Sequence, residues 1–146
     1  MKTLAIQIVN KSPFPAPSYA TPGSAGADIC ANLTDAITIA KNQIILVPTG
    51  LSIALPQGFE AQIRSRSGMT LKHGIVVANG VGTIDSDYRG EIQVILHNIS
   101  DRDYLLQPGE RIAQMIIAAC VQADFVLSAA LDSTQRGFGG FGHSGK

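Results

Sequence analysis

Short runs of β-branched and other apolar residues, each ended by glycine, proline, asparagine or aspartate, recur along this chain. In the clearest run, 59–64, Phe59, Ala61 and Ile63 alternate with polar residues, so a strand here would have one apolar face. Many short strands at even spacing are typical of a β sandwich, a jelly roll or a barrel. The length of 146 residues suits one domain with room for a buried core. We therefore expect an all-β domain.

The strands that we expect cover residues 4–9, 37–39, 44–49, 51–55, 59–64, 75–78, 81–85, 91–98, 104–106, 112–121 and 125–127. Two stretches could also be read as helical. Residues 69–72 could form a helical turn that stops at His73-Gly74, whereas we assign the apolar run 111–121 to a strand because the surrounding pattern is β. The proline-rich residues 11–23 are expected to be irregular.

Charge and composition argue against several classes of function. The formal net charge is +0 and the pI is near 6.8, whereas duplex nucleic-acid binders usually carry a basic excess. Tryptophan is absent, so no aromatic platform for single strands is evident. No segment approaches the roughly 18 consecutive apolar residues of a membrane helix, and no signal-peptide pattern is visible. Cys30 and Cys120 form no metal-ligand set with the histidines, and we expect two buried free thiols in a cytoplasmic protein.

Five polar or glycine-rich segments could carry chemistry. In 80–91, Asp85 and Asp87 lie two residues apart at the end of an expected strand and are bracketed by glycines. If the strand continues, both carboxylates point to the same face, and their proximity disfavours joint ionisation, which suits a general base. Solvated aspartates in a hairpin turn would give the same pattern, and the pattern alone favours that simpler interpretation.

The other four segments are suited to anions or to a metal. Residues 64–68 offer guanidinium groups, hydroxyls and backbone amides for phosphate, although no P-loop is present. Asp28 belongs to a turn or is a carboxylate near a metal, and Gln114 is a hydrogen-bonding group or part of a strand face. Residues 136–145 are rich in glycine, and composition alone favours a mobile terminus there.

In order and in their spread from Ala25 to Gly145, these five segments resemble the five sequence motifs of the homotrimeric dUTPase family. The segments 82–90 and 136–145 are the most specific. The resemblance implies a jelly-roll-like β barrel of the β-clip type. It also implies a homotrimer whose active sites are shared among subunits. The division that follows is a β-barrel domain, 1–135, and a flexible C-terminal arm, 136–146, that closes over the active site.

The same resemblance implies an activity: hydrolysis of dUTP at the α-phosphorus to dUMP and pyrophosphate, which limits uracil incorporation into DNA and supplies dUMP for thymidylate synthesis. Mg²⁺ is the implied cofactor, held mainly by the substrate phosphates and water. Asp85 would be the general base that activates the attacking water, and Asp28 would approach the water shell of the metal. The implied partners are dUTP and two further copies of the chain, with no nucleic acid and no membrane.

The family also implies contacts for the substrate. Asn79 and the hairpin backbone at Gly82, Thr83 and Ile84 would read the uracil edge. Tyr88 would pack against the deoxyribose and exclude a 2′-hydroxyl, and Phe141 would stack on the base. Contacts to the phosphate chain are implied for Arg66, Ser67, Gly68, Gln114, Arg136, Gly142, His143 and Ser144. Asp87 and Arg89 are expected to serve structure, as an ion pair or an interface contact.

Two alternatives stay open at this point. A dCTP deaminase would share the architecture but needs a general-base glutamate, and the chain has only Glu60, Glu91 and Glu110. A non-catalytic relative would be expected to have lost Asp85, Tyr88 or the glycine-rich arm, and all three are present. Phe138 takes a position that is often small or polar in the family, which leaves the packing of the arm open.

Overall fold

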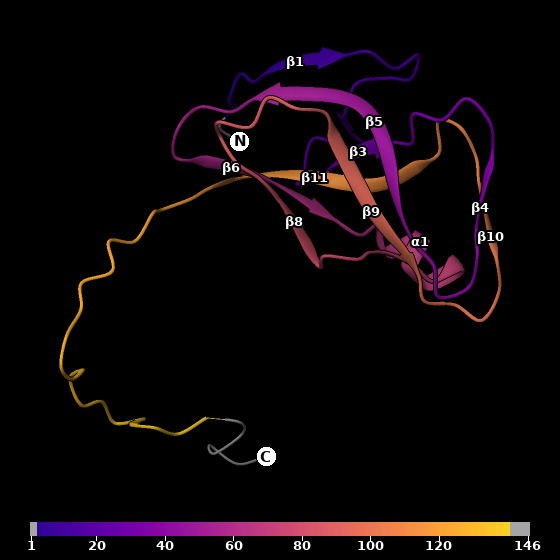
Figure 1. Cartoon of the computed structure of the whole chain (residues 1–146). Helices are drawn as coiled ribbons and strands as arrows, with labels where there is room; N and C mark the ends of the chain where they lie inside the picture. The colour runs from indigo at the N-terminus through magenta and orange to yellow at the C-terminus, as the bar shows by residue number, and fades with distance from the viewer. Residues whose placement is uncertain (1–2, 141–146) are drawn as a thin grey trace.

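The computed structural model describes residues 3–140 and confirms an almost entirely β chain (Figure 1). Within that range the elements are β1 (Gln7–Asn10), β2 (Ser18–Tyr19), β3 (Ala27–Cys30), β4 (Ile37–Ile39), β5 (Ile44–Ala54), β6 (Phe59–Arg64), α1 (Ser67–His73), β7 (Ile75–Val77), β8 (Val81–Ile84), β9 (Ile92–Asn98), β10 (Tyr104–Leu106) and β11 (Arg111–Ala119). No helix in residues 3–140 has the length and apolar character to cross a membrane.

The strands form two larger sheets and one small one, with antiparallel pairing throughout the described residues. One sheet has the order β1-β5-β9-β7, the second has the order β2-β3-β11-β6-β8, and β10 pairs with β4. Strands of all three contribute to a single hydrophobic core, in which Ile29, Ile92 and Leu106 have no exposed surface. Burial of each such side chain stabilises the fold by about 1.5–3 kcal/mol.

The alternating run 59–64 behaves as expected and becomes β6. Ala61 and Ile63 are buried in the core, whereas Glu60, Gln62 and Arg64 lie on the opposite face. The outward side chains form a hydrogen-bonded ladder, since Gln62 Nε2 donates to Glu60 Oε1 (2.7 Å) and Arg64 Nε donates to Gln62 Oε1 (3.1 Å). The polar face of this strand is therefore ordered, and it belongs to the same sheet face as the candidate site described below.

The long apolar run 111–121 is a strand, as predicted, but it contains a β-bulge. Its pairing with β3 shifts register between Arg111 and Ala113. Ile112 and Ala113 are consecutive and yet both are buried, which strict alternation does not allow. The extra residue therefore turns Arg111 to the same outer face as Gln114, three positions along.

The two strands expected at 44–49 and 51–55 are one strand, β5, with a register shift between Pro48 and Leu51. Gly50 has φ 71° at this bulge. The backbone amides of Thr49 and Gly50 both donate to Glu91 Oε1, at 3.2 and 2.7 Å. A carboxylate from the start of β9 thus satisfies the amides that the bulge leaves unpaired, and the strand continues through it.

The helical turn expected at 69–72 is the core of α1, a seven-residue helix with buried Met69. It ends where the sequence predicts, because Gly74 takes the left-handed conformation (φ 67°) and its N–H bonds to Thr70 O at 3.0 Å. Residues 11–23 are irregular as expected except for the two-residue strand β2. The short strand β3 was missed because its apolar positions, Ala27 and Ile29, are too few to form a recognisable pattern.

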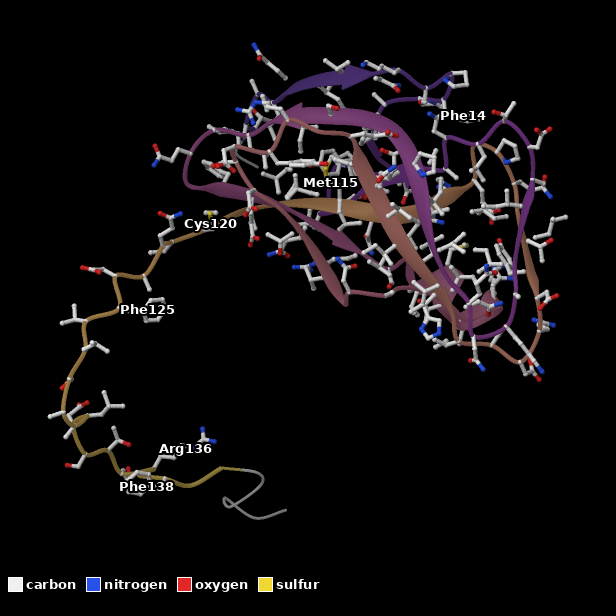
Figure 2. The ribbon with its side chains drawn as sticks, viewed as in Figure 1. Phe14, Met115, Cys120, Phe125, Arg136 and Phe138 are labelled. Carbon is white, nitrogen blue, oxygen red and sulfur yellow. The ribbon has the colours of Figure 1, made fainter. Side chains whose placement is uncertain are left out.

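The strand expected at 125–127 is wrong. After β11 the chain leaves the body and runs away from it (Figure 1), and Figure 2 shows Phe125 and Phe138 on this outlying segment. Phe125 is 91% exposed and Leu127 is 101% exposed. A β-type pattern forms a strand only where another strand pairs with it, and the described part of this chain offers no partner to 125–127. We call residues 120–140 the tail.

Candidate active site

Two of the expected site residues, Asp28 and Gln114, lie on the outer face of the five-stranded sheet, away from the core. The register places Asp28 of β3 opposite Gln114 of β11, and Gln114 opposite Arg64 of β6. One cross-strand row therefore carries a carboxylate, an amide and a guanidinium on adjacent strands. Side chains that the sequence separates by up to 86 positions thus lie side by side because of strand pairing.

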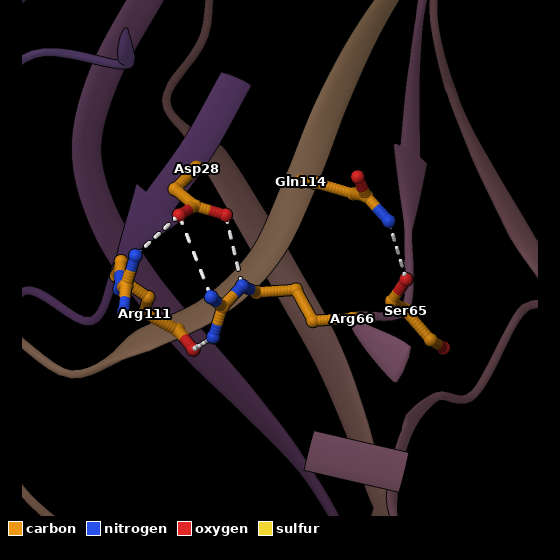
Figure 3. Close-up of polar contacts among 5 residues, drawn as sticks. All are labelled: Asp28, Ser65, Arg66, Arg111 and Gln114. Atoms are coloured by element: carbon orange, nitrogen blue, oxygen red, sulfur yellow. Dashed lines mark hydrogen bonds and ion pairs between the residues drawn. The ribbon is translucent and has the colours of Figure 1, made fainter. Parts of the chain in front are cut away.

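Asp28 is held by two arginines (Figure 3). Arg66 Nε donates to Asp28 Oδ1 at 2.8 Å, and Arg111 Nη1 donates to Asp28 Oδ2 at 2.9 Å. Arg66 Nη1 also donates to the backbone carbonyl of Arg111 at 3.1 Å. Two guanidinium groups face one carboxylate, so this cluster carries an excess of one positive charge that suits an anionic ligand. We call Asp28, Arg66 and Arg111 the arginine triad.

A hollow of about 400 Å³ lies beside the triad. Its walls come from the turn before β3, the start of α1 and β11, and they include Ser24, Gly26, Asp28, Arg66, Ser67, Gly68, Arg111 and Gln114. Gln114 is oriented by its own amide, because Nε2 donates to Ser65 O at 2.9 Å. A Cβ at Gly26 would overlap the carboxamide oxygen of Gln114, so the glycine leaves room for that side chain. The structure therefore brings together the expected residues of three segments in one cationic hollow.

Arg111 was missed by the sequence reasoning, although it lies in the segment from which Gln114 was chosen. Counting along a regular strand puts Arg111 and Gln114 on opposite faces. The bulge at Ile112 puts them on the same face, and its sequence signal is two apolar residues in a row at the start of a strand. That signal is weak in a run where almost every residue is apolar.

The hairpin that follows α1 opens into two sheets. β7 pairs with β9 and β8 pairs with β6, so the two strands joined by the turn at 78–80 are edge strands of different sheets. Gly80 in the turn has φ 74°, and Asn79 lies against Gly82, where an added Cβ would be 3.2 Å from Asn79 Nδ2. One backbone edge of β8 has no partner strand among the described residues. Its amides and carbonyls are therefore available to a ligand.

Asp85 follows β8 at the opposite end of the sheet from the triad. It is exposed and lines a second hollow of about 830 Å³ together with Glu60, Asp87 and the first residues of the tail. The loop after it is ordered by Tyr88, whose N–H bonds to Asp85 O (3.2 Å) and whose hydroxyl donates to Glu91 O (3.0 Å). Thr83 and Ile84 lie on β8 beside this loop.

The expected ion pair between Asp87 and Arg89 is not among the ion pairs of residues 3–140. Arg89 Nη1 instead donates to two backbone carbonyls, Ser86 O at 2.7 Å and Tyr88 O at 2.8 Å. Arg89 thus closes the loop that carries Asp85, and Asp87 stays exposed.

The two hollows do not meet within one chain. Ala61 pairs with Ile84, so Asp85 lies near the Glu60 end of β6, and Arg66 follows the other end. Positions 60 and 66 are six residue steps apart, which corresponds to roughly 20 Å in an extended chain. Arg136 belongs to the tail, where its Nε donates to Gly139 O at 2.8 Å, and it is remote from both hollows (Figure 2). Phe141, Gly142, His143 and Ser144 lie outside the described residues.

The thiols and possible metal ligands add little to the site. Both cysteines are free, as expected, but Cys30 is only half-buried and Cys120 is exposed, because each lies at a strand end. Burial raises the pKa of the Cys30 thiol above its usual value. No group of three or more histidine, cysteine, aspartate or glutamate side chains in the described range could hold a metal. Among the residues that the structure describes, Asp28 is the only carboxylate lining the cationic hollow.

Comparison with known proteins gives one consistent result. A family model described as dUTPase matches residues 12–145. Among curated proteins, the deoxyuridine 5′-triphosphate nucleotidohydrolase of Fusobacterium nucleatum is 47% identical over 146 residues, which is 100% of both chains. The protein of the same name from Roseobacter denitrificans is 54% identical over 132 residues, covering 90% of this chain and 87% of its own.

Solved structures share the fold at low sequence identity. A mutant dUTPase of phage 80alpha has a TM-score of 0.88 at 22% identity and covers 98% of this chain and 100% of its own. The phage 80alpha dUTPase with dUpNHpp has a TM-score of 0.85 at 22% identity, covering 99% of this chain and 100% of its own. A mutant from phage phi11, described with a structural Mg(II) ion, has a TM-score of 0.80 at 18% identity over 89% of this chain and 100% of its own. The jelly-roll β-clip architecture expected from the sequence is thereby confirmed.

Proposed function

This chain belongs to the dUTPase family, and we propose on that premise that it hydrolyses dUTP at the α-phosphorus to dUMP and pyrophosphate. The observation that carries the proposal is the arrangement of the five-stranded sheet, which has a cationic hollow at one end, an exposed carboxylate at the other and the open edge of β8 running between them. A nucleoside triphosphate needs both kinds of surface, because its phosphates are anionic and its base is recognised by directional hydrogen bonds.

The nucleoside belongs at the hairpin. The unpaired edge of β8 at Gly82, Thr83 and Ile84, with the Asn79 amide beside it, presents donors and acceptors in the way that a pairing base does. Cytosine reverses the donor and acceptor at position 4 of the ring, so it would leave buried polar groups unpaired. Tyr88 would pack against the deoxyribose. Its hydroxyl is already bonded to Glu91 O, which fixes the ring. We propose that a ring held in this way excludes a 2′-hydroxyl.

The triphosphate belongs at the cationic hollow, and Asp85 acts at the junction. Arg66, Ser67, Gly68 and Gln114 supply a guanidinium, a hydroxyl, backbone amides and a carboxamide to phosphate oxygens. Asp85 accepts a proton from a water molecule and orients it for in-line attack at the α-phosphorus, and pyrophosphate leaves. The protein otherwise contributes positioning and charge stabilisation, which dominate phosphoryl-transfer catalysis.

The hollow fits Mg²⁺ held mostly by its substrate. One carboxylate, Asp28, faces it, and no wider set of protein ligands is present in the described range. Mg²⁺ retains several waters and is commonly bound through one or two carboxylates plus substrate phosphates, so Asp28 would touch the water shell of the metal. When bound, the metal offsets the charge that develops on the phosphates.

The separation of the two hollows supports an active site built from more than one copy. Since Asp85 and Arg66 lie roughly 20 Å apart along β6, they can serve one α-phosphorus only if different chains supply them. Closed symmetric assembly repeats such a shared site, and we propose a homotrimer. The domain 1–135 would form its body. The arm 136–146, which carries Arg136, Phe141, Gly142, His143 and Ser144, would close over a site and exclude water.

A dCTP deaminase is the alternative on this architecture, and the family match does not favour it. Its general base would be a glutamate, and the three glutamates of this chain already have partners. Glu60 accepts from Gln62, Glu91 from the β5 bulge and Glu110 from Tyr104 and the Gln107 amide.

The test of the proposal is pyrophosphate release from dUTP, dCTP, dTTP and UTP with Mg²⁺. We expect release from dUTP alone and no ammonia from dCTP. Asp85→Asn should bind dUTP but turn over at least roughly a hundredfold more slowly, because it removes a general base. Asp87→Asn is the matched control, since it removes a neighbouring exposed carboxylate. Unchanged turnover in Asp85→Asn would exclude Asp85 from the mechanism. Ammonia release from dCTP would show that the protein deaminates dCTP instead.

A further inference from the structure

The β-bulge in β11 puts a second arginine where a regular strand would not. Arg111 pairs with Cys30, Gln114 pairs with Asp28, and the residues between them are both buried. Bulges cost pairing and are frequent next to active sites, where they re-aim a side chain. Here the consequence is that Arg111 reaches Asp28 from the side opposite to Arg66 (Figure 3).

The contact distances show that Arg111 changes how Arg66 binds Asp28. Arg66 Nε lies 2.8 Å from Asp28 Oδ1, but Arg66 Nη2 lies 3.5 Å from Oδ2. In a complete two-pronged pair both distances would be about 2.7–2.9 Å. Oδ2 is instead bonded to Arg111 Nη1 at 2.9 Å. The second prong of Arg66 is therefore long and weak, and it shares its acceptor with the shorter bond from Arg111.

We propose that Arg111 is a positioning residue that keeps the Arg66 guanidinium available to the triphosphate by holding the second oxygen of Asp28. This inference rests on the proposed function. The backbone carbonyl of Arg111 also accepts from Arg66 Nη1 at 3.1 Å. Arg111 therefore orients the Arg66 guanidinium through its backbone and weakens the bond from Arg66 to Asp28 through its side chain. Without the Arg111 side chain, Asp28 would take both prongs of Arg66. A phosphate would then have to break a complete ion pair before it could bind.

The exposed fractions of the three side chains agree with a phosphate-binding role for Arg66 and a positioning role for Arg111. Arg66 and Asp28 are 24% and 22% exposed, whereas Arg111 is 58% exposed. A half-exposed arginine contributes little to folding stability through one ion pair. Its removal is therefore expected to leave the fold intact, and the effect should appear in ligand binding.

The experiment is calorimetric titration of dUpNHpp with Mg²⁺ into Arg111→Gln and the unsubstituted protein. We expect Arg111→Gln to bind about tenfold more weakly, equivalent to about 1.4 kcal/mol. KM for dUTP should rise to match, and kcat should stay within about twofold because Asp85 is untouched. Arg102→Gln is the control. It also removes one exposed arginine charge, and the Arg102 guanidinium donates to Lys72 O, away from the hollow.

A second pair of variants separates positioning from direct phosphate contact. In an Asp28→Asn background, Arg111 has lost the carboxylate through which it acts, so adding Arg111→Gln should change dUpNHpp affinity by less than about twofold. If the tenfold loss persists in that background, Arg111 contacts the ligand itself and the proposal is overturned. Equal affinity of Arg111→Gln and the unsubstituted protein also overturns it. Failure of the unsubstituted protein to bind dUpNHpp would instead count against the proposed function.

Discussion

Tyr104 joins the two structural parts that carry the arginine triad. Its hydroxyl donates to Glu110, the residue before Arg111, and lies 3.8 Å from Met69 Sδ in α1. Its ring lies 4.9 Å from the ring of His73 at the end of that helix. Glu110 in turn accepts from the Gln107 amide at 3.0 Å. A single phenol thus connects the helix after Arg66 with the turn before Arg111.

The environment of this phenol predicts how stability depends on pH. Burial raises the pKa of Tyr104 well above its usual value, and the hydrogen bond and negative charge of Glu110 add to the increase. The folded state therefore retains a proton that the unfolded state releases near pH 10. The stabilisation is complete below that pH and is lost as the pH rises above it.

Tyr104→Phe should lower the free energy of unfolding by about 1 kcal/mol at pH 7, because one hydrogen bond is lost. Between about pH 10 and 11 the variant should lose stability less steeply than the unsubstituted protein, since it lacks the phenol that titrates. Urea unfolding at several pH values measures both effects. Tyr19→Phe, at a 55% exposed site, is the control. Parallel pH profiles for Tyr104→Phe and the unsubstituted protein would contradict this account.

At the scale of single elements, the sequence predicts a strand well where one face of it is buried. It predicts a strand poorly where formation depends on whether a neighbouring strand is available for pairing. The alternation in 59–64 predicts β6 correctly because its apolar face enters the core. The strand predicted at 125–127 fails because the same residue types have no neighbouring strand within the described chain. β3 was missed because its apolar positions are too few to form a pattern, and β5 was split in two because a bulge interrupts a pattern without ending the strand.

In the candidate site, the sequence likewise predicts some residues and misses contacts that depend on strand pairing. Asp28, Arg66, Ser67, Gly68 and Gln114 were predicted through the family resemblance, and they line one hollow. The contact of Asp28 with two arginines and the position of Arg111 depend on strand register and on a one-residue bulge. The sequence carries no local sign of the register and only a weak sign of the bulge, because both are set by partners on distant strands.

The C-terminal end of α1 offers a test of what holds this element against its neighbours. Gly74 has φ 67° and an added Cβ would lie 2.7 Å from Ser100 Cβ, whereas Gly58 has φ 85° and open space. Both alanine substitutions impose left-handed strain of about 1–2 kcal/mol, and only Gly74→Ala adds a collision. We expect urea midpoints to show a loss of stability at Gly74 larger by about 1 kcal/mol or more. Equal losses would mean that the loop at Ser100 moves aside freely.

At the scale of the whole molecule, the tail of a single chain leaves apolar side chains exposed to solvent. The tail exposes Val121, Phe125, Val126, Leu127 and Leu131, each by at least 81%. Exposed apolar side chains gathered on one segment mark an interaction site. Together with the separation of Asp85 from Arg66, this exposure supports an assembly in which copies complete one another.

Mixing two inactive variants tests that assembly directly. Asp85→Asn and Arg66→Gln damage opposite half-sites, so every chain in a mixture carries one defect. If neighbouring chains supply Asp85 and Arg66 to one site, unfolding and refolding the two variants together at equal amounts should restore about a quarter of the unsubstituted activity. Half of the chains keep Asp85 and the other half keep Arg66. When neighbouring chains assemble at random, about one site in four therefore receives both intact residues.

The matched control is a mixture of Arg66→Gln with Gln114→Ala. These two residues line the same hollow of one chain, so every hollow in the mixture keeps one defect. Pyrophosphate release from that mixture should equal the average of its two components. If the Asp85→Asn and Arg66→Gln mixture likewise gains nothing, the two residues act within a single chain. The strand register that separates them by roughly 20 Å could then not describe the active enzyme.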